Sequence, residues 1–168
     1  RHVGMIFQSY NLVPRVTVLK NVMFARVPDM SLFKVIFGLF SKEDKLVALD
    51  SLNKVGILDK AYIRADQLSG GQQQRVSLAS ALSQESEILL ADEPVSALDP
   101  VTAKEVMDDF KRINEEFNKT ILLNIHHVEL ALEYASRIIA VKKGKIVYDG
   151  PSQEVTKEIL DEVYRKEA

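Results

Sequence analysis

Two adjacent carboxylates follow a short apolar run near the middle of the chain. The run covers residues 88–91, and Asp92 and Glu93 come directly after it. A run of this length predicts a buried strand, and parallel α/β sheets bind their ligands where the strands end. An apolar run ending in Asp-Glu also occurs at ordinary strand–loop junctions. The pair is therefore a candidate for one half of a phosphate-handling site.

A turn of small residues upstream is a candidate for the other half. Leu68 is followed by Ser69, Gly70, Gly71 and Gln72, which open directly into a predicted helix. Glycines let the backbone approach a ligand, and the first NH groups of a helix have no partner inside it. With a serine hydroxyl and the positive end of the helix dipole, they suit a phosphate. An isolated Ser-Gly-Gly, however, more often marks an ordinary turn.

The glycine turn and the carboxylate strand occur in an order that is characteristic of one protein family. A predicted helix at 73–84 joins the glycine turn to the carboxylate strand, and Ser-Ala-Leu-Asp follows at 96–99. This arrangement resembles the signature motif, Walker B strand and D-loop of ATP-binding-cassette (ABC) ATPases. The resemblance implies that Asp92 holds Mg²⁺ through water and that Glu93 polarises the attacking water.

The start of the chain extends the resemblance. Residues 3–7 predict a buried strand that ends at Gln8, which alone is most simply a surface glutamine. Followed by the segments 9–14 and 17–22, Gln8 resembles the glutamine of the ABC Q-loop. The resemblance implies that its side-chain carbonyl binds Mg²⁺, that it contacts the attacking water and that the loop senses a transmembrane partner.

A histidine pair follows the strand predicted at 120–125. This strand comes one βα unit after the carboxylate strand, so both ends are expected along the same sheet edge. A histidine in such a position is more often structural than catalytic. By resemblance, His126 is the switch histidine that contacts the γ-phosphate. His127 stands where most family members carry Asp, so either histidine could face the nucleotide.

The resemblance also implies a head-to-tail homodimer that binds ATP and Mg²⁺. Each ATP lies between the P-loop of one subunit and the signature motif of the other. Ser69, Gly70, Gly71 and Gln72 would close on the nucleotide of the partner, and Asp99 would communicate across the interface.

The elements that position these residues predict an α/β fold. The β-α-β-α-β pattern from residue 88 onward predicts a parallel sheet, here a P-loop NTPase-like sheet flanked by helices. The resemblance makes residues 1–168 a partial ABC ATPase domain with an inserted α-helical subdomain. In the expected division, residues 1–20 and 85–150 form the catalytic core and 21–84 the helical, signature-bearing subdomain. Residues 151–168 follow the break at Gly150-Pro151, with a charged helix from residue 155.

The insertion is predicted to be largely helical. Residues 31–40 are strongly apolar and predict either a buried helix or a groove that receives a coupling helix of a membrane subunit. Ser41 and Asp44 predict the start of the next helix and Gly56 its end. The buried stripe of this helix is expected at Leu46, Leu49, Leu52 and Val55. The string at 36–44 narrows the resemblance to phosphonate-import ATPases.

Three further elements are predicted beyond the carboxylates. Asp99-Pro100 predicts the start of a helix with the buried stripe Val106, Phe110, Ile113 and Phe117. A second helix has an apolar face at Val128, Ala131, Leu132 and Ala135. Strands at 137–141 and 146–148, joined by a turn, predict a hairpin.

The composition favours a soluble cytosolic protein and excludes cysteine chemistry. The chain has 168 residues, a net charge of −2, 46% apolar residues and no cysteine. The near-neutral charge gives no support for nucleic-acid binding, and thiolate nucleophiles and cysteine zinc sites are excluded. No apolar run reaches the roughly 18–20 residues of a membrane span. We expect a protein bound peripherally to the cytoplasmic face of the cell membrane.

One family motif is absent from the chain. A P-loop reads G-x-x-x-x-G-K-S/T, and the single Gly-Lys pair, Gly144-Lys145, lacks the earlier glycine. The start at Arg1, without an initiator Met, predicts a partial chain whose P-loop lies upstream. We therefore expect this chain alone to be inactive in ATP hydrolysis and poorly soluble.

The residues and the resemblance together predict the ATPase subunit of an importer. Its cargo is expected to be phosphonate or a related phosphorus oxyanion, and its partners a second ATPase subunit, permease subunits and, indirectly, a substrate-binding protein. One alternative is a non-transport ABC ATPase of translation or DNA repair, although residues 9–67 are too few for the coiled-coil arms of DNA-repair relatives. Another alternative is a non-catalytic interaction module.

Overall fold

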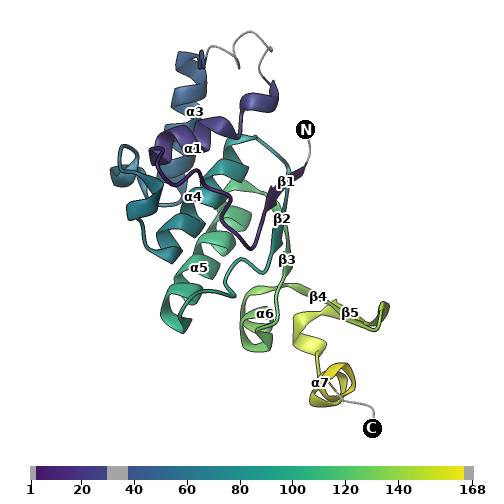
Figure 1. Ribbon diagram of the computed structural model, residues 1–168. Helices are drawn as coiled ribbons and strands as arrows, with labels where there is room; N and C mark the ends of the chain where they lie inside the picture. Colours follow the sequence, from purple (N-terminus) through teal and green to yellow (C-terminus); the bar gives the residue numbers. More distant parts are fainter. Residues whose placement is uncertain (1–2, 30–37, 165–168) are drawn as a thin grey trace. The chain divides into compact units, whose positions relative to one another are not determined.

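The computed structural model describes residues 3–29 and 38–164, which fold as two compact units. The first unit is Arg1–Asn124 and the second is Ile125–Ala168 (Figure 1). The predicted helix at 31–40 lies almost wholly outside the described residues. Each unit is described by itself below.

The first unit contains a parallel sheet of three strands. In spatial order these are β1 (Val3–Ile6), β2 (Ile88–Asp92) and β3 (Thr120–Asn124). The register pairs Asp92 at the end of β2 with Asn124 at the end of β3. The predicted parallel pairing is confirmed for these strands, and their carboxyl ends meet at one edge of the sheet.

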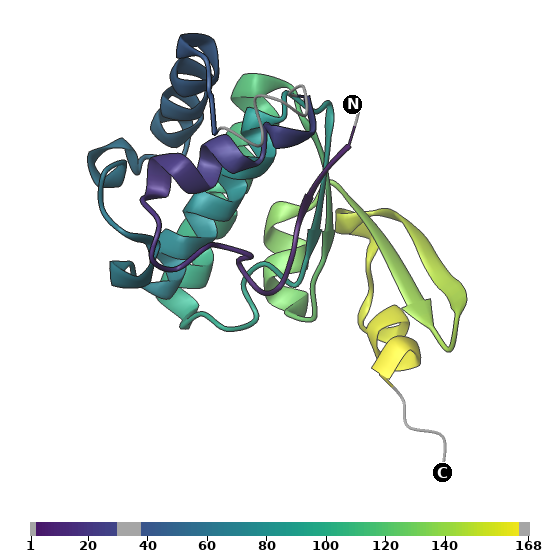
Figure 2. The same ribbon diagram turned by 45° about the horizontal axis from the view of Figure 1, so that its top comes forward.

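Helices cover one side of this sheet (Figure 2). They are α1 (Val18–Phe24), α3 (Lys42–Lys54), α4 (Gly70–Ser83) and α5 (Pro100–Phe117), with 3-10 turns at Val27–Asp29, Leu58–Lys60 and Ala65–Gln67. Ile6 and Leu89 are fully buried on the helix side of the strands, and Leu78 and Phe110 are buried on the helices. The core therefore lies between the sheet and this helical layer.

The prediction that the strands at 3–7 and 120–125 are buried is wrong for one of their faces. Val3 and Met5 on β1 are 47% and 45% exposed, and Leu122 on β3 is 56% exposed. These residues share a face, because Met5 pairs with Leu90 and Leu90 with Leu122. In the described part of the first unit, that face carries no helix. Apolar content predicts a strand but does not say whether both of its faces are covered.

Helix α3 begins and ends as the sequence predicts. The backbone NH of Asp44 donates to Ser41 Oγ at 3.0 Å, and the NH of Ser41 donates to Asp44 Oδ2 at 3.0 Å, which forms a capping box. Gly56, with φ +67°, follows the helix end. The predicted stripe is partly wrong because Leu46 is 66% exposed. The buried face instead comprises Ala48, Ser51, Leu52 and Val55, since α3 packs with that face against α1 and α4.

Helix α5 also follows its predicted pattern. Asp99 Oδ1 accepts hydrogen bonds from the NH groups of Val101 and Thr102, both at 3.1 Å. Val106, Phe110 and Ile113 are buried as expected. Phe117 is partly exposed, and Lys54 Nζ lies 5.0 Å from the centre of its ring. The C-terminus of α5 is therefore held against α3 by a cation–π contact.

An ion pair anchors the N-terminus of α3. Arg26 Nε donates to Asp44 Oδ1 at 2.8 Å, and Arg26 NH1 donates to the carbonyl of Ser83 at 2.6 Å and to Glu85 Oε2 at 3.1 Å. The hydrogen bond from Arg26, together with one from Ser41, lowers the pKa of Asp44 to about 2. Arg26 thus ties the start of α3 to the end of α4.

Replacing Asp44 with Asn tests this anchor through its pH dependence. The folded pKa of about 2 lies below the ordinary value of 3.8, so the stabilisation is present above the ordinary value and is lost as the pH falls toward the folded value. After allowance for solvent screening, we expect D44N to lower the free energy of unfolding at neutral pH by about 1–2 kcal/mol. Urea unfolding of the full-length protein at a series of pH values would show this difference shrinking below about pH 4. A difference that stays constant through the acid range would contradict the assignment.

The second unit combines an antiparallel hairpin with two helices. The hairpin strands are β4 (Arg137–Lys142) and β5 (Lys145–Pro151), and the helices are α6 (Val128–Tyr134) and α7 (Lys157–Tyr164), with a 3-10 turn at Ser152–Glu154. The predicted hairpin is confirmed. In the described residues of both units, no helix is long and apolar enough to cross a membrane.

Two expectations for this region are wrong. The β-α-β-α-β pattern predicts β4 in the parallel sheet, but among the described strands β4 pairs only with β5; Lys143 and Gly144, with φ of +49° and +74°, form the turn between them. Gly150 and Pro151 lie within β5 and so do not end the strand before them. The helix expected from residue 155 begins at Lys157.

Candidate functional site

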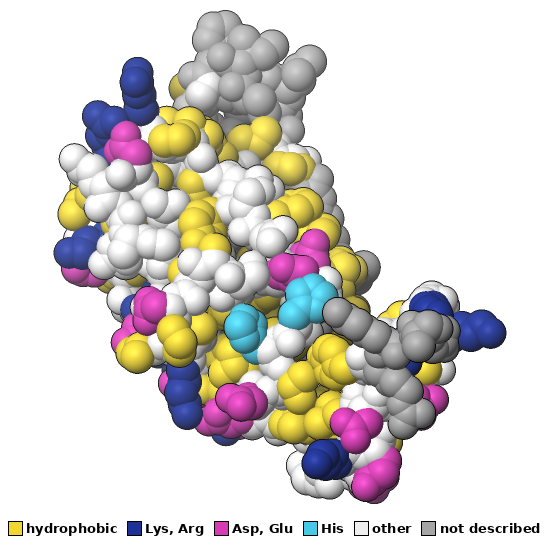
Figure 3. All heavy atoms as spheres, turned by 60° about the horizontal axis from the view of Figure 1, so that its bottom comes forward, with side chains coloured by type: hydrophobic (Ala, Val, Ile, Leu, Met, Phe, Trp, Pro, Cys, Tyr) yellow, Lys and Arg dark blue, Asp and Glu magenta, His cyan; other side chains and the backbone are white. Residues whose placement is uncertain are grey.

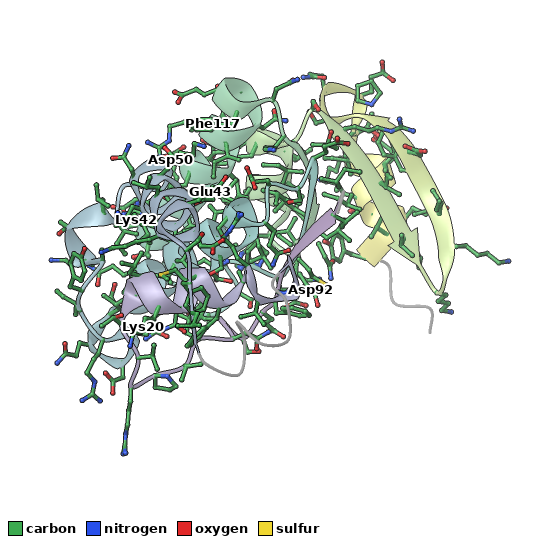
Figure 4. The ribbon with its side chains drawn as sticks, turned by 90° about the horizontal axis from the view of Figure 1, so that it is seen from above. Lys20, Lys42, Glu43, Asp50, Asp92 and Phe117 are labelled. Carbon is green, nitrogen blue, oxygen red and sulfur yellow. The ribbon has the colours of Figure 1, made fainter. Side chains whose placement is uncertain are left out.

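Asp92 and Glu93 lie at the carboxyl edge of the parallel sheet. Asp92 is the last residue of β2, and its side chain lies among the strands, apart from the labelled side chains of α1 and α3 (Figure 4). Asn124 Nδ2 donates to Asp92 Oδ1 at 2.7 Å. The backbone NH of Glu93 donates to the carbonyl of Asn124 at 2.9 Å. The end of β3 therefore orients the carboxylate of Asp92 and holds the backbone of Glu93.

Glu93 has a backbone conformation that is unusual for its residue type. Its φ is +46°, in the left-handed region, which costs a residue with a Cβ on the order of 1 kcal/mol or more. Ser96 stabilises the turn, because its hydroxyl donates to the carbonyl of Glu93 at 3.0 Å. A strained turn directly after two carboxylates is typical of a position fixed by function.

Gln8 contacts Glu93 although 85 residues separate them in the sequence. Gln8 Nε2 donates to Glu93 Oε2 at 3.1 Å and to Ser96 Oγ at 3.3 Å. The structure thus brings together Gln8, Asp92 and Glu93, which the sequence analysis named as site residues. An amide donor holds the carboxylate of Glu93 at the sheet edge.

The chemistry of these side chains fits Mg²⁺ held together with a phosphate. Mg²⁺ prefers oxygen ligands and is usually bound through one or two carboxylates, waters and substrate phosphates. Asp92 supplies an exposed carboxylate, and Gln8 supplies an amide oxygen while its nitrogen contacts Glu93. Among the described residues there is no group of three or more His, Cys, Asp or Glu side chains that could hold a metal. The side-chain oxygens of Asp92 and Gln8 fit a Mg²⁺ ion whose other ligands are waters and phosphate oxygens.

Ser69 is the N-cap of helix α4, which begins at Gly70 rather than at residue 73 and so includes both glycines of the predicted turn. Ser69 Oγ accepts from the NH of Gln72 at 3.4 Å, and Gln72 Oε1 accepts from the NH of Ser69 at 3.1 Å. This capping box leaves other first-turn NH groups of α4 without a partner within the helix. Ser69 is exposed at this positive helix end, which suits an anion from outside the chain.

Packing also limits the space for a side chain at both glycines, more severely at Gly71 than at Gly70. A Cβ at Gly71 would lie 2.3 Å from Thr102 Cγ2, and a Cβ at Gly70 would lie 3.1 Å from the hydroxyl of Tyr10. The start of α4 therefore sits directly against the start of α5. Beside this contact is a pocket of about 140 Å³, lined by Ser69, Gly71, Gln72, Arg75, Thr102, Glu105 and Val106.

Asp99 lies at the start of α5 as its N-cap. Hydrogen bonds from Thr102, and from the NH of Val101, lower the pKa of the Asp99 carboxyl. The residue therefore stays ionised and organises the helix start. Its expected role across a dimer interface stays a prediction.

The two candidate histidines belong to the second unit. His126 and His127 are both exposed, and His127 occupies the N-cap position of α6 without a side-chain capping bond. Figure 3 shows histidine side chains at the surface of one face of the molecule. The contact of His126 with the γ-phosphate stays a prediction. Which of the two histidines faces the nucleotide also stays open.

Sequence reasoning missed two residues of this site. Asn124 orients Asp92, and its role depends on the register of two strands that are distant in the sequence. Ser96 was read only as part of the loop at 96–99, but it holds both Gln8 and the turn at Glu93. A polar residue at the end of each neighbouring strand is the signal that could have identified Asn124.

A second pocket lies beside the segment that follows Gln8. It has a volume of about 270 Å³. Its lining includes Phe7 directly after β1, Tyr10 and Val13 from the following loop, and Phe24 from α1. Ser77 and Ser80 of α4 and its C-cap residue Gln84 also line it. Phe7, Val13 and Phe24 are 39–45% exposed, so apolar surface reaches solvent here.

Comparison with known proteins gives consistent matches. Residues 1–96 match the family model described as ABC transporter. The chain is 99% identical over 168 residues to the phosphonates import ATP-binding protein PhnC of Lactococcus lactis subsp. lactis (strain IL1403), covering 100% of this chain and 68% of that protein. It is 57% identical over 164 residues to the PhnC of Staphylococcus aureus (strain bovine RF122 / ET3-1), covering 98% of this chain and 64% of that protein.

A solved structure supports the fold. The dimeric ATP-binding cassette MJ0796, in a post-hydrolysis state bound to ADP and Pi, matches with a TM-score of 0.71 and 35% sequence identity. The match covers 90% of this chain and 63% of that chain. The α/β, P-loop NTPase-like fold and the similarity to phosphonate-import ATPases, both predicted from sequence, are confirmed.

Proposed function

Because this chain belongs to the ABC transporter family, we propose that it carries the catalytic edge and signature motif of an importer ATPase. The full-length protein would hydrolyse ATP to drive the uptake of phosphonate or a related phosphorus oxyanion. The chain spans 68% of the length of its Lactococcus relative and contains no P-loop motif. We therefore expect no ATP hydrolysis from the 168-residue chain alone.

The contact between Gln8 and Glu93 is the observation that carries this proposal. It joins the predicted Q-loop to the predicted catalytic carboxylate at 3.1 Å. In the proposed reaction Glu93 accepts a proton from the attacking water, and Gln8 positions that water. His126 stabilises the γ-phosphate. Phosphoryl transfer depends mainly on such positioning and on charge stabilisation.

Asp92 and Gln8 are the residues proposed to hold Mg²⁺. The hydrogen bond from Asn124 orients the Asp92 carboxylate for binding through water. A Mg²⁺ ion held by these residues would supply positive charge to the phosphate groups of ATP. Oxygen ligands on two neighbouring strand ends are the observation that supports this assignment.

The signature residues are proposed to act on the nucleotide of a partner subunit. Ser69, Gly70, Gly71 and Gln72 present a capped helix start whose polarity suits a γ-phosphate. A head-to-tail homodimer would place this helix start against the P-loop of the other subunit, with Asp99 at the interface. The dimeric state of MJ0796 supports this arrangement.

The pocket of about 270 Å³ is the proposed contact for a permease subunit. It borders the loop after Gln8, and its exposed apolar side chains suit a short helix of a membrane protein. Docking there would hold the subunit peripherally on the cytoplasmic face of the membrane. A substrate-binding protein would act on the ATPase only through the permease.

Reconstituted transport tests the proposal. The full-length protein would be assembled with its permease subunits in vesicles and supplied with a binding protein loaded with a simple alkylphosphonate or with inorganic phosphate. We expect phosphonate to stimulate ATP hydrolysis and to accumulate inside the vesicles. Hydrolysis that is indifferent to permease and phosphonate, but responds to ribosomes, would contradict an importer and favour the translation alternative.

A further inference from the structure

A buried carboxylate links three helices of the first unit. Asp109 lies in the middle of α5, and its side chain is 11% exposed. Its Oδ2 accepts from Arg75 Nε of α4 at 2.7 Å, and its Oδ1 accepts from Arg112 at 2.8 Å. Arg112 also donates to the carbonyl of Lys54, the last residue of α3, at 2.8 Å. Both oxygens of one carboxylate are thus used to hold α3, α4 and α5 together.

The contacts between α4 and α5 show that these helices run parallel. Gly71 meets Thr102, and four residues further along α4, Arg75 meets Glu105 and Asp109. The contacts therefore advance in the same direction along both helices, which lie side by side (Figure 1). The starts of the two helices lie at the same end of the pair. One start carries Ser69 and the other carries Asp99.

The ion pairs of Asp109 add a directional attachment to the apolar packing of these helices. Their dipoles repel when the two positive ends lie together, so polarity alone does not hold this arrangement. Burial raises the pKa of the Asp109 carboxyl, and the charge of Arg75 and then that of Arg112 oppose this rise. A carboxylate that stays ionised here depends on its guanidinium partners, and each guanidinium is oriented by it in return.

We propose that Asp109, acting through Arg75, is a positioning residue that sets the direction of the signature helix relative to α5 and so places Ser69 and Gln72 for the nucleotide of the partner subunit. Arg75 lies one turn beyond Gln72 on α4 and also lines the pocket beside Ser69. A tilt of α4 about this attachment moves the helix start, although neither Asp109 nor Arg75 touches the nucleotide. This inference rests on the proposed function. It adds Asp109 and Arg75, as positioning residues, to the residues proposed to contact the nucleotide.

The test uses the full-length protein with Glu93→Gln as the parent, so that bound ATP is not consumed. Asp109→Asn is added, and two quantities are measured: the binding of fluorescent ATP to the single subunit and the ATP-driven dimerisation. We expect ATP binding to be unchanged and dimerisation to weaken at least about tenfold, because the displaced helix start meets a nucleotide only in the closed dimer. Asp50→Asn, which removes the 2.7 Å pair with Lys54 on the surface of α3, is the matched control and should leave both quantities unchanged.

Three outcomes separate the alternatives. If Asp109→Asn only lowers the melting temperature and dimerises like the parent, Asp109 has a purely structural role and the inference is wrong. If Asp109→Asn does not fold, Arg75→Gln, at a side chain that is 26% exposed, is expected to show the same selective loss, and normal dimerisation of that variant would overturn the inference. A parent that binds ATP but never dimerises would contradict the proposed function itself.

Discussion

Glu93→Gln in the full-length protein is expected to retain ATP binding and to lower ATP turnover at least about 100-fold, the usual scale for the loss of a general base. Glutamine keeps the shape of the side chain and an oxygen that can accept from Gln8 Nε2, which now donates to Glu93 Oε2 at 3.1 Å. It cannot take a proton from water. The binding of fluorescent ATP and the steady-state release of phosphate measure the two halves of this prediction.

The matched control is Glu116→Gln, the same change at an exposed position near the end of α5. It should leave turnover unchanged and the free energy of unfolding within about 0.5 kcal/mol of the unmodified protein. Near-normal turnover in Glu93→Gln would remove Glu93 from the proposed mechanism. The sheet edge would then bind nucleotide without supplying the base.

Ser69→Asp is expected to leave the fold intact and to abolish most turnover. Aspartate is as good an N-cap as serine and favours the positive end of α4, so the free energy of unfolding should stay the same or rise by up to about 1 kcal/mol. The new carboxylate would face the γ-phosphate of the partner and repel it. We expect turnover to fall about 100-fold or more, together with ATP-driven dimerisation.

Ser69→Asn separates charge from shape in this experiment. Asparagine caps helices as well as aspartate and is nearly isosteric with it, but it is neutral. We expect Ser69→Asn to keep much more activity than Ser69→Asp, with both variants folded by circular dichroism and urea unfolding. Equal turnover in the two variants would contradict an anion contact at this helix start.

The local signals in the sequence predicted the parts of the site that depend on local structure. The caps at Ser41 and Asp99 could be predicted because a side-chain oxygen and a nearby NH belong to the same short segment. Asp92 and Glu93 follow their strand because an apolar run and its polar end are continuous in the chain. Such features need no knowledge of distant residues.

Features that depend on strand pairing and coverage could not be predicted in this way. Asn124 orients Asp92 only because β2 and β3 pair in one particular register. The exposure of Met5 and Leu122 depends on which faces the helices cover, and the pattern of apolar residues does not contain that information. The hairpin of β4 and β5, by contrast, could be predicted, because its turn at Lys143 and Gly144 is local.

Arg75 illustrates the same limit on a helix. From the sequence it could be a solvated cation, since its partner Asp109 is 34 residues away. The structure shows instead that it attaches α4 to α5. Helical periodicity places Arg75 on α4 but does not reveal which helix lies opposite.

Mixing two inactive variants of the full-length protein tests the central claim most directly. Glu93→Gln subunits lack the proposed base, and Ser69→Asp subunits lack the proposed signature contact. In a mixed dimer both defects fall in one ATP site and the other site is intact. We predict that equal amounts of the two variants, after subunit exchange, recover up to about a quarter of the unmodified ATPase activity, because about half of the dimers are mixed and one of their two sites is complete. If mixed dimers form, as shown by co-purification of two different tags, but remain as inactive as either variant alone, then Glu93 and Ser69 do not act on one nucleotide across a dimer interface.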